Sequence, residues 1–147
     1  MLVENPILRG FHPDPSPVLA RGVYYLAVST FEWFPGVRIY RSQDLVHWTY
    51  TCAPLDSEDK MVLEGTMASD GVWAPHLSFD GERFYLLYTV VHGARRHPVM
   101  DVDNFLISAP DITGPWSKPV YLNSSGFDPS LFHGEDGRKW VLNMEWD

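Results

Sequence analysis

Cysteine is nearly absent from this chain of 147 residues, which contains only Cys52. One thiol cannot form a disulfide within the chain, and it supplies none of the paired-cysteine spacings that hold zinc. The histidines also lack a zinc-ligand spacing, so turn, core or pocket-rim positions are expected for all six: His12, His47, His76, His92, His97 and His133. No glycine-rich phosphate loop and no Gly-x-Ser-x-Gly elbow is present. We therefore expect neither a metal nor a cofactor.

Positive charge is also scarce, because 11 Lys and Arg face 19 Asp and Glu, a formal net charge of −8. Nucleic acids and anionic membranes favour basic patches, so neither is expected as a partner, whereas a neutral substrate fits. No apolar run approaches the roughly 18 residues of a membrane-spanning helix. The first residues show neither the basic nor the apolar region of a signal peptide, so we expect a cytoplasmic location.

Long helical periodicity is missing as well. The chain has instead short apolar and aromatic runs separated by Gly, Pro, Asp and Ser. This pattern predicts an all-β fold. Aromatic residues make up 14% of the chain, and they suit both sheet cores and sugar-binding platforms. Packing inside the sheets accounts for most of them.

Three segments of the chain resemble one another. Their marker prolines, Pro15, Pro75 and Pro129, are 60 and 54 residues apart. Each proline opens a short strand, and a turn and an aromatic strand follow. The first two segments continue with a strand ending in Ser, an Asp-aliphatic turn and a Trp that opens a last strand. The predicted strands are 16–19, 23–30, 37–42, 49–52, 74–78, 83–89, 104–108, 118–122, 128–132 and 139–144. The segment at 92–98 is expected to be a solvated loop.

Four strands in a repeat of about this size are typical of a β-propeller blade. We predict two blades and half of a third, at about residues 10–55, 70–122 and 126–147. Propellers close with about four to eight blades, so residues 1–147 are expected to be the N-terminal part of a longer propeller domain. The alternative is a small β-sandwich that ends at Asp147.

The chain carries Asp14, Ala74 and Asp128 at equivalent corners, each just before a marker proline. Trp73 directly precedes Ala74, the residue at the second corner. The first strand of each blade lines the propeller axis, so the two acids are expected to converge on one funnel beside the indole. Paired carboxylates near an aromatic wall suit glycoside hydrolysis. Ordinary turn acids and packing of Trp73 within a blade are the competing interpretations. The proline after Asp14 favours an extended backbone at that acid.

The sequence also resembles a known family, glycoside hydrolase family 43, and most closely its β-xylosidase branch. The motifs that carry the resemblance are NPILRGFHPDPS at 5–16, STFEWFPGV at 29–37, DLVHW at 44–48, GVWAP at 71–75 and GFDPSLFH at 126–133. They span nearly the whole chain in the same order as in the family. The resemblance implies a five-bladed propeller and inverting removal of xylose or arabinofuranose from the non-reducing end of xylo-oligosaccharides or arabinosides.

The resemblance also implies roles for individual residues. Asp14 matches the general base, and Asp128 matches the acid that raises the pKa of the general acid and orients it. Phe31 and Trp73 match aromatic walls of the sugar pocket. The sequence leaves open a homo-oligomer of the full-length form.

The chain departs from the family pattern in one respect. The family's general acid is a glutamate at a corner of a later blade, and no such corner is present here. Glu145 is expected within the second strand of the third segment and Glu64 in a linker, so neither is assigned as the acid. Little or no activity is therefore expected of these residues alone. A non-catalytic carbohydrate-binding propeller and a truncated remnant without function are the other two hypotheses.

Overall fold

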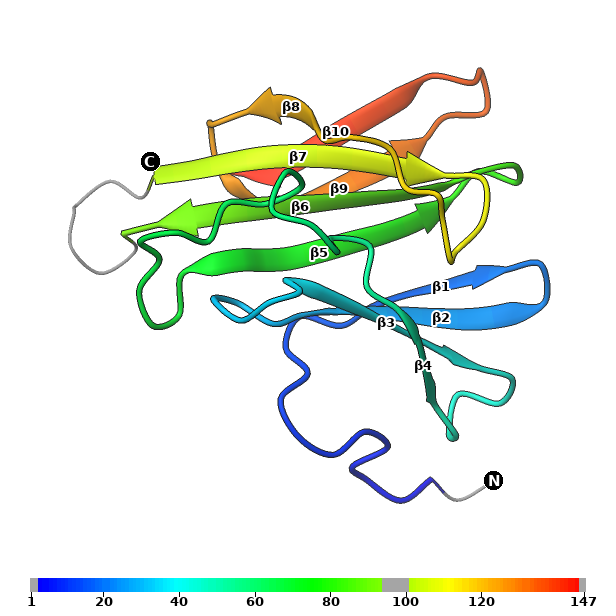
Figure 1. The fold of residues 1–147 in the computed structure, drawn as a ribbon. Helices are drawn as coiled ribbons and strands as arrows, with labels where there is room; N and C mark the ends of the chain where they lie inside the picture. The colour runs from blue at the N-terminus through cyan, green and yellow to red at the C-terminus, as the bar shows by residue number, and fades with distance from the viewer. Residues whose placement is uncertain (1–2, 94–100, 146–147) are drawn as a thin grey trace.

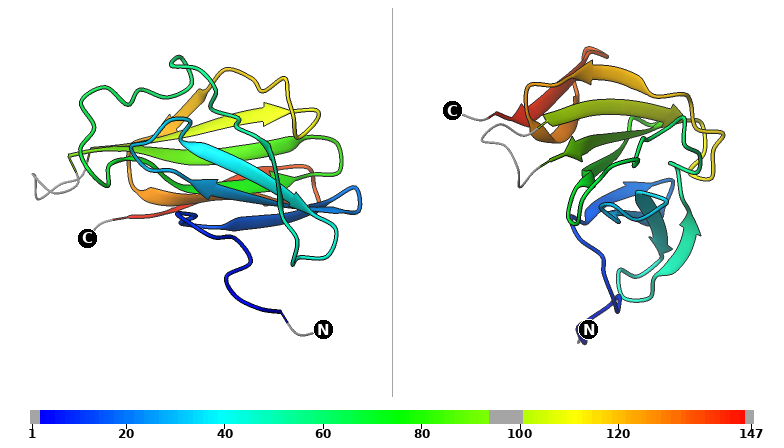
Figure 2. Two further views of the ribbon diagram at one scale, coloured as in Figure 1. Left: turned by 60° about the horizontal axis from the view of Figure 1, so that its bottom comes forward. Right: turned by 60° about the vertical axis from the view of Figure 1, so that its left-hand side comes forward.

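The computed structural model describes residues 3–93 and 101–145, and these residues form ten β-strands and no helix. All the strand pairs are antiparallel, and they form three sheets (Figures 1 and 2). The all-β prediction is confirmed. The described part of the chain has no long apolar helix of the kind that crosses a lipid bilayer. The predicted loop at 92–98, with His97, lies for the most part outside the described residues.

The strands follow the predicted order. The first sheet contains β1 (Ser16–Ala20), β2 (Val23–Ser29), β3 (Val37–Ser42) and β4 (Thr49–Cys52). The second contains β5 (Gly71–Phe79), β6 (Phe84–His92), β7 (Asp101–Ala109) and β8 (Val120–Asn123), and the third β9 (Phe127–His133) and β10 (Lys139–Met144). Each sheet pairs its strands in chain order, which is the arrangement that the sequence repeat predicts.

Three bounds differ from the prediction by three residues: β5 begins at Gly71 instead of Ala74, β6 ends at His92 instead of Thr89, and β7 begins at Asp101 instead of Asn104. Residues 71–73 pair with β6 on one side of a register shift, and the pairing resumes at His76 on the other side. The two residues between them, Ala74 and Pro75, form a bulge, and a bulge interrupts a strand without ending it. The predicted start at Ala74 is therefore the bulge, within the observed strand.

The second sheet lies between the other two, with β5 beside β1 and β2 on one side and beside β9 on the other (Figure 1). The main core fills the space between the first two sheets. Its fully buried members include Val37, Ile39, Leu55, Val72, Phe84, Leu86, Tyr88 and Ile107. Burying an aliphatic or aromatic side chain of this kind contributes about 1.5–3 kcal/mol, so this contact fixes how the first two sheets meet.

Cys52 at the end of β4 adds a polar link between the first two sheets. Its thiol donates a hydrogen bond to the carbonyl of Ile112, with 3.0 Å between sulfur and oxygen. Burial raises the pKa of the Cys52 thiol to about 12. The thiol is therefore protonated, as this hydrogen bond requires.

A close backbone contact joins the first two sheets near Phe31. The amide of Val72 donates to the carbonyl of Phe31 over 3.1 Å, which forms an isolated bridge between the two segments. The neighbouring residue is Gly71, at a φ of +87°, and a Cβ placed there would lie 2.3 Å from the same carbonyl oxygen. Only glycine combines that backbone conformation with so close an approach.

We predict that Gly71→Ala destabilises the protein more than Gly65→Ala. Both glycines have positive φ, but a Cβ at Gly65 meets no atom within 4 Å. Gly65→Ala should cost about 1–2 kcal/mol for the left-handed backbone, and Gly71→Ala should add about 1–3 kcal/mol from overpacking. Urea unfolding of the two variants of the complete protein measures the difference. Equal losses would show that the contact with Phe31 is unimportant.

Candidate active site

The three corner residues share one unusual backbone conformation. Asp14, Ala74 and Asp128 have φ values of 51°, 34° and 53°. All three lie in the left-handed region, although a following proline disfavours compact conformations and favours extended ones. The expectation of an extended Asp14 is therefore wrong. The repeat is a repeat of backbone geometry as well as of sequence, and the neighbouring sheets override the local bias of proline.

This geometry brings both acids to one place. Asp14 and Asp128 line one open hollow of about 420 Å³, together with Ala74 and His76 and the prolines of all three corners. Asp14 lies two residues before β1, and Asp128 is the second residue of β9. The carboxylates are 114 residues apart in the sequence. The structure thus places the two predicted acids on a shared surface.

The two carboxyl groups influence each other. Partial burial, and after it the negative charge of Asp14, raises the pKa of Asp128 above its ordinary value. A carboxyl with a raised pKa holds its proton to higher pH than a free one. Asp128 is therefore less readily ionised than an ordinary aspartate.

Ser29, at the end of β2, holds the segment that carries Asp14. Its hydroxyl donates to Oδ2 of Asp14 over 3.4 Å, and its amide donates to the carbonyl of Pro13 over 3.2 Å. Ser29 is fully buried, so the Asp14 segment is anchored to the interior of the first sheet. Sequence analysis missed this serine, because the two residues meet only when β1 and β2 pair.

Four aromatic rings form a row beside the two corners. The ring centroids are 5.4 Å apart between Phe11 and Phe31, 6.2 Å between Phe31 and Trp73, and 6.0 Å between Trp73 and Phe127. The indole of Trp73 donates a hydrogen bond to the carbonyl of Ser69 over 2.8 Å. The structure thus brings together Phe31 and Trp73, the two predicted sugar walls.

Sequence analysis did not single out Phe11 and Phe127. The signal for Phe127 was present, because it precedes Asp128 as Trp73 precedes Ala74. Phe31 also lines a second cavity, of about 590 Å³, together with Phe11, His12 and Trp33. None of the four rings of the row lines the hollow of Asp14 and Asp128 itself, although Trp73 and Phe127 directly precede corner residues.

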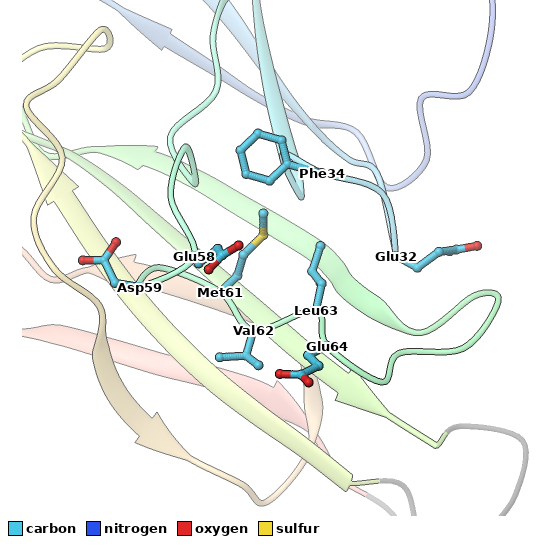
Figure 3. Close-up of a pocket in the computed structure, with 8 residues that line it drawn as sticks. All are labelled: Glu32, Phe34, Glu58, Asp59, Met61, Val62, Leu63 and Glu64. Carbon is cyan, nitrogen blue, oxygen red and sulfur yellow. The ribbon is translucent and has the colours of Figure 1, made fainter.

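A further cavity of about 870 Å³ lies between the Phe31–Gly36 turn and the linker that follows β4 (Figure 3). Its carboxylates are Glu32, Glu58, Asp59 and Glu64. Figure 3 shows that Glu32, Asp59 and Glu64 point in different directions around it. None of the four predicted site residues lines this cavity, and nowhere in residues 3–93 and 101–145 do three or more His, Cys, Asp or Glu form a group that could hold a metal ion.

Neither of the two other glutamates considered in the sequence lies in the hollow. Glu64 lines the cavity of Figure 3, and the exposed Glu145 lies just beyond β10 instead of within it. Within the part of the chain that the structure describes, no glutamate lines the hollow of Asp14 and Asp128. The carboxyl groups that line this hollow are those of Asp14 and Asp128.

Comparison with known proteins gives a consistent picture. The family model of glycosyl hydrolases family 43 matches residues 3–147. The chain is 52% identical to a xylosidase/arabinosidase of Humicola insolens and 51% identical to a β-xylosidase of Bacillus subtilis, covering 99% and 100% of this chain. It spans 27% of the length of each of these relatives.

A solved structure is also similar. The crystal structure of a xylan β-1,4-xylosidase from Bacillus halodurans superposes with a TM-score of 0.95 at 55% identity. The match covers 99% of this chain and 28% of that protein. The three sheets and their corners are therefore arranged as in that xylosidase.

We predict that Asp128→Asn stabilises the fold at neutral pH. Because the folded-state pKa of Asp128 is raised, its ionised form is disfavoured in the folded protein, and this loss of stability develops as pH rises. Thermal unfolding of variant and parent at about pH 3 and about pH 7 should show a gain that is larger at the higher pH.

Asp111→Asn is the control for this experiment. Hydrogen bonds from Thr113 lower the pKa of Asp111, so removing that charge should destabilise the fold at neutral pH and have less effect in acid. The same sign of pH dependence for both variants would contradict the electrostatic description of the hollow.

Proposed function

The chain belongs to glycosyl hydrolase family 43, and on this basis we propose that it supplies part of the active site of an inverting glycosidase. The enzyme removes xylose or arabinofuranose from the non-reducing end of xylo-oligosaccharides or arabinosides. The observation that carries the proposal is the shared hollow of Asp14 and Asp128 at two equivalent corners. Relatives named as xylosidases and arabinosidases support the substrate class.

We further propose that the three sheets are blades of a five-bladed propeller. Residues 10–55 and 70–122 form the first two blades, and residues 126–147 begin the third. This is supported by exposed apolar side chains on β9 and β10, since Phe132, Trp140 and Leu142 are 60%, 52% and 55% exposed. Two further strands and a following blade would cover such a surface, which otherwise favours aggregation.

In the proposed mechanism Asp14 is the general base. Its carboxylate takes a proton from a water molecule as the water oxygen attacks the anomeric carbon, on the face opposite the leaving oxygen. The glycosidic bond breaks, and the leaving oxygen receives a proton from a general acid. In inverting enzymes these two groups are about 6.5–9.5 Å apart, which leaves room for the water.

Asp128 orients the general acid and raises its pKa in this proposal. A negative charge nearby disfavours a second ionisation, so the acid keeps its proton near neutral pH. The general acid itself is a glutamate supplied from outside residues 1–147. Phe31 and Trp73 provide the aromatic surface on which the apolar face of the sugar packs.

We predict that Asp14→Ala in the complete protein lowers kcat on an aryl β-xyloside by about 10²–10⁴-fold, the range for loss of a general base. The melting temperature should fall modestly, because Asp14 has a positive φ that alanine tolerates less well and accepts a hydrogen bond from Ser29, so kcat is compared below the melting range of both proteins. The matched control is Asp59→Asn, another exposed acid, which should keep parental turnover. Full turnover by Asp14→Ala would refute the role of the base.

We also predict that residues 1–147 expressed alone turn over the same substrate at or near the uncatalysed rate. The general acid is missing from this piece, and an incomplete propeller leaves the pocket open. The complete reading frame, assayed in parallel, is the positive control. Equal activity of the two proteins would mean that the acid lies within these residues after all.

A further inference from the structure

Two hydrogen bonds at equivalent positions connect the innermost strands of neighbouring sheets. The amide of Leu77 on β5 donates to Oγ of Ser16 on β1 over 3.0 Å. The amide of Leu131 on β9 donates to Nδ1 of His76 on β5 over 3.1 Å. Each acceptor is the second residue after a corner, and each donor is the third. The same link is thus made twice, once by a serine and once by a histidine.

The two acceptors differ in their response to pH. A serine hydroxyl accepts a hydrogen bond at any pH, whereas Nδ1 of histidine accepts one only when it carries no proton. A backbone amide cannot act as the acceptor here, so the link between β5 and β9 requires the neutral imidazole of His76 with its proton on Nε2. Protonation of Nδ1 would replace this hydrogen bond by two donors facing each other.

The position of His76 connects this link to the proposed active site. His76 lines the same hollow as Asp14 and Asp128. The residue that it holds, Leu131, is buried and lies three positions after Asp128 on β9. We infer that His76 is a positioning residue, which fixes Asp128 opposite Asp14 by holding β9 against β5 and which releases β9 when the imidazole is protonated.

This inference rests on the proposed function, because it assigns regulation by pH to that same site. It also rests on a second contact between the two strands. Nε2 of His133 on β9 lies 3.0 Å from Oγ of Ser78 on β5. In this contact the histidine is on β9, whereas in the first link it is on β5. Ser78 is buried. The two histidines together align β9 with β5, along a boundary that has no backbone ladder between the strands.

The net effect of the surroundings of His76 is to favour its neutral form at neutral pH. Burial, and after it the charge of His133, lowers the pKa of His76. The carboxylates of Asp14 and Asp128 face the same hollow and would stabilise a charged ring. The charged and titratable groups around His133, among the described residues, are Tyr85 on β6, Asp80 in the hairpin after β5 and Lys139 on β10.

The direction of the pH effect follows from this shift. Since the folded-state pKa of His76 lies below its ordinary value, the unfolded state binds the proton more readily. The stabilisation of the fold by neutral His76 is therefore fully present at pH values above the ordinary histidine pKa. It is lost as pH falls through the folded-state value. We expect the link to be intact at neutral pH and to open in mildly acidic solution.

The test compares His76→Asn with His76→Ala in the complete protein. Oδ1 of asparagine can take the place of Nδ1 and does not titrate, so His76→Asn should keep kcat near the parental value at neutral pH and lose less activity in acid. His76→Ala removes the acceptor and should lower kcat by about 10²-fold at neutral pH, the size of effect expected from a small misplacement. KM should change much less than kcat, because the change affects alignment.

His47→Asn is the control for loss of a titrating imidazole. The side chain of His47 is 87% exposed and contacts Asp44 in a surface turn. Its substitution should leave both kcat and the pH profile unchanged. If kcat falls in acid to the same extent in His76→Asn as in the parent, the role of protonation is overturned. This comparison does not depend on whether His76→Ala folds.

Crystal structures of the parent and of both His76 variants separate this inference from the proposed function. The carboxyl groups of Asp14 and Asp128 should keep their separation in His76→Asn. In His76→Ala the separation between the two carboxyl groups should change. If that variant does not fold, the separation should change instead in crystals of the parent that are transferred to acid. Unchanged separation would overturn the positioning role even in an active enzyme. Absence of all glycosidase activity in the parent would refute the proposed function, while the carboxyl separation would still decide the positioning role.

Discussion

The left-handed backbone at three equivalent corners is the constraint on which the candidate site depends. Such a conformation costs about 1–2 kcal/mol for a residue with a Cβ, and aspartate tolerates it better than alanine. Asp14 and Asp128 are therefore suited to the place for structural reasons, whereas Ala74 at φ 34° is strained. The strain persists because the sheets on both sides of β5 hold the corner in place. Two acids distant in sequence share a hollow as a result.

The arrangement has a cost in stability and a benefit in chemistry. Burial, and after it the nearby charge of Asp14, raises the pKa of Asp128, which disfavours the folded state at neutral pH. The same repulsion is what a site needs if one group is to stay protonated while another is ionised. The buried Ser29 holds the segment of Asp14 against β2, and the ring contact between Trp73 and Phe127 joins the corners of β5 and β9.

Much of the fold could be predicted from the sequence, because alternating aromatic strands separated by Gly and Asp turns are local signals. The repeat placed Asp14 and Asp128 at equivalent corners, and the structure agrees. The positive φ at Asp14 could not be predicted, since Pro15 favours the opposite and only the assembled sheets override it. The contacts of His76 with Leu131 and of Trp73 with Phe127 join residues more than 50 positions apart, for which no local pattern exists. The roles of the acids came from family resemblance.

The hydrogen-bonded thiol of Cys52 has a practical consequence. Thiolates react with alkylating reagents and thiols hardly do, and a pKa of about 12 keeps this group unreactive while it lies against the carbonyl of Ile112. Separation of the first two sheets would expose the sulfur and restore ordinary reactivity. Because the chain has one cysteine, the rate at which Cys52 is alkylated measures how often the first two sheets separate. Mass spectrometry can follow this reaction without an engineered cysteine.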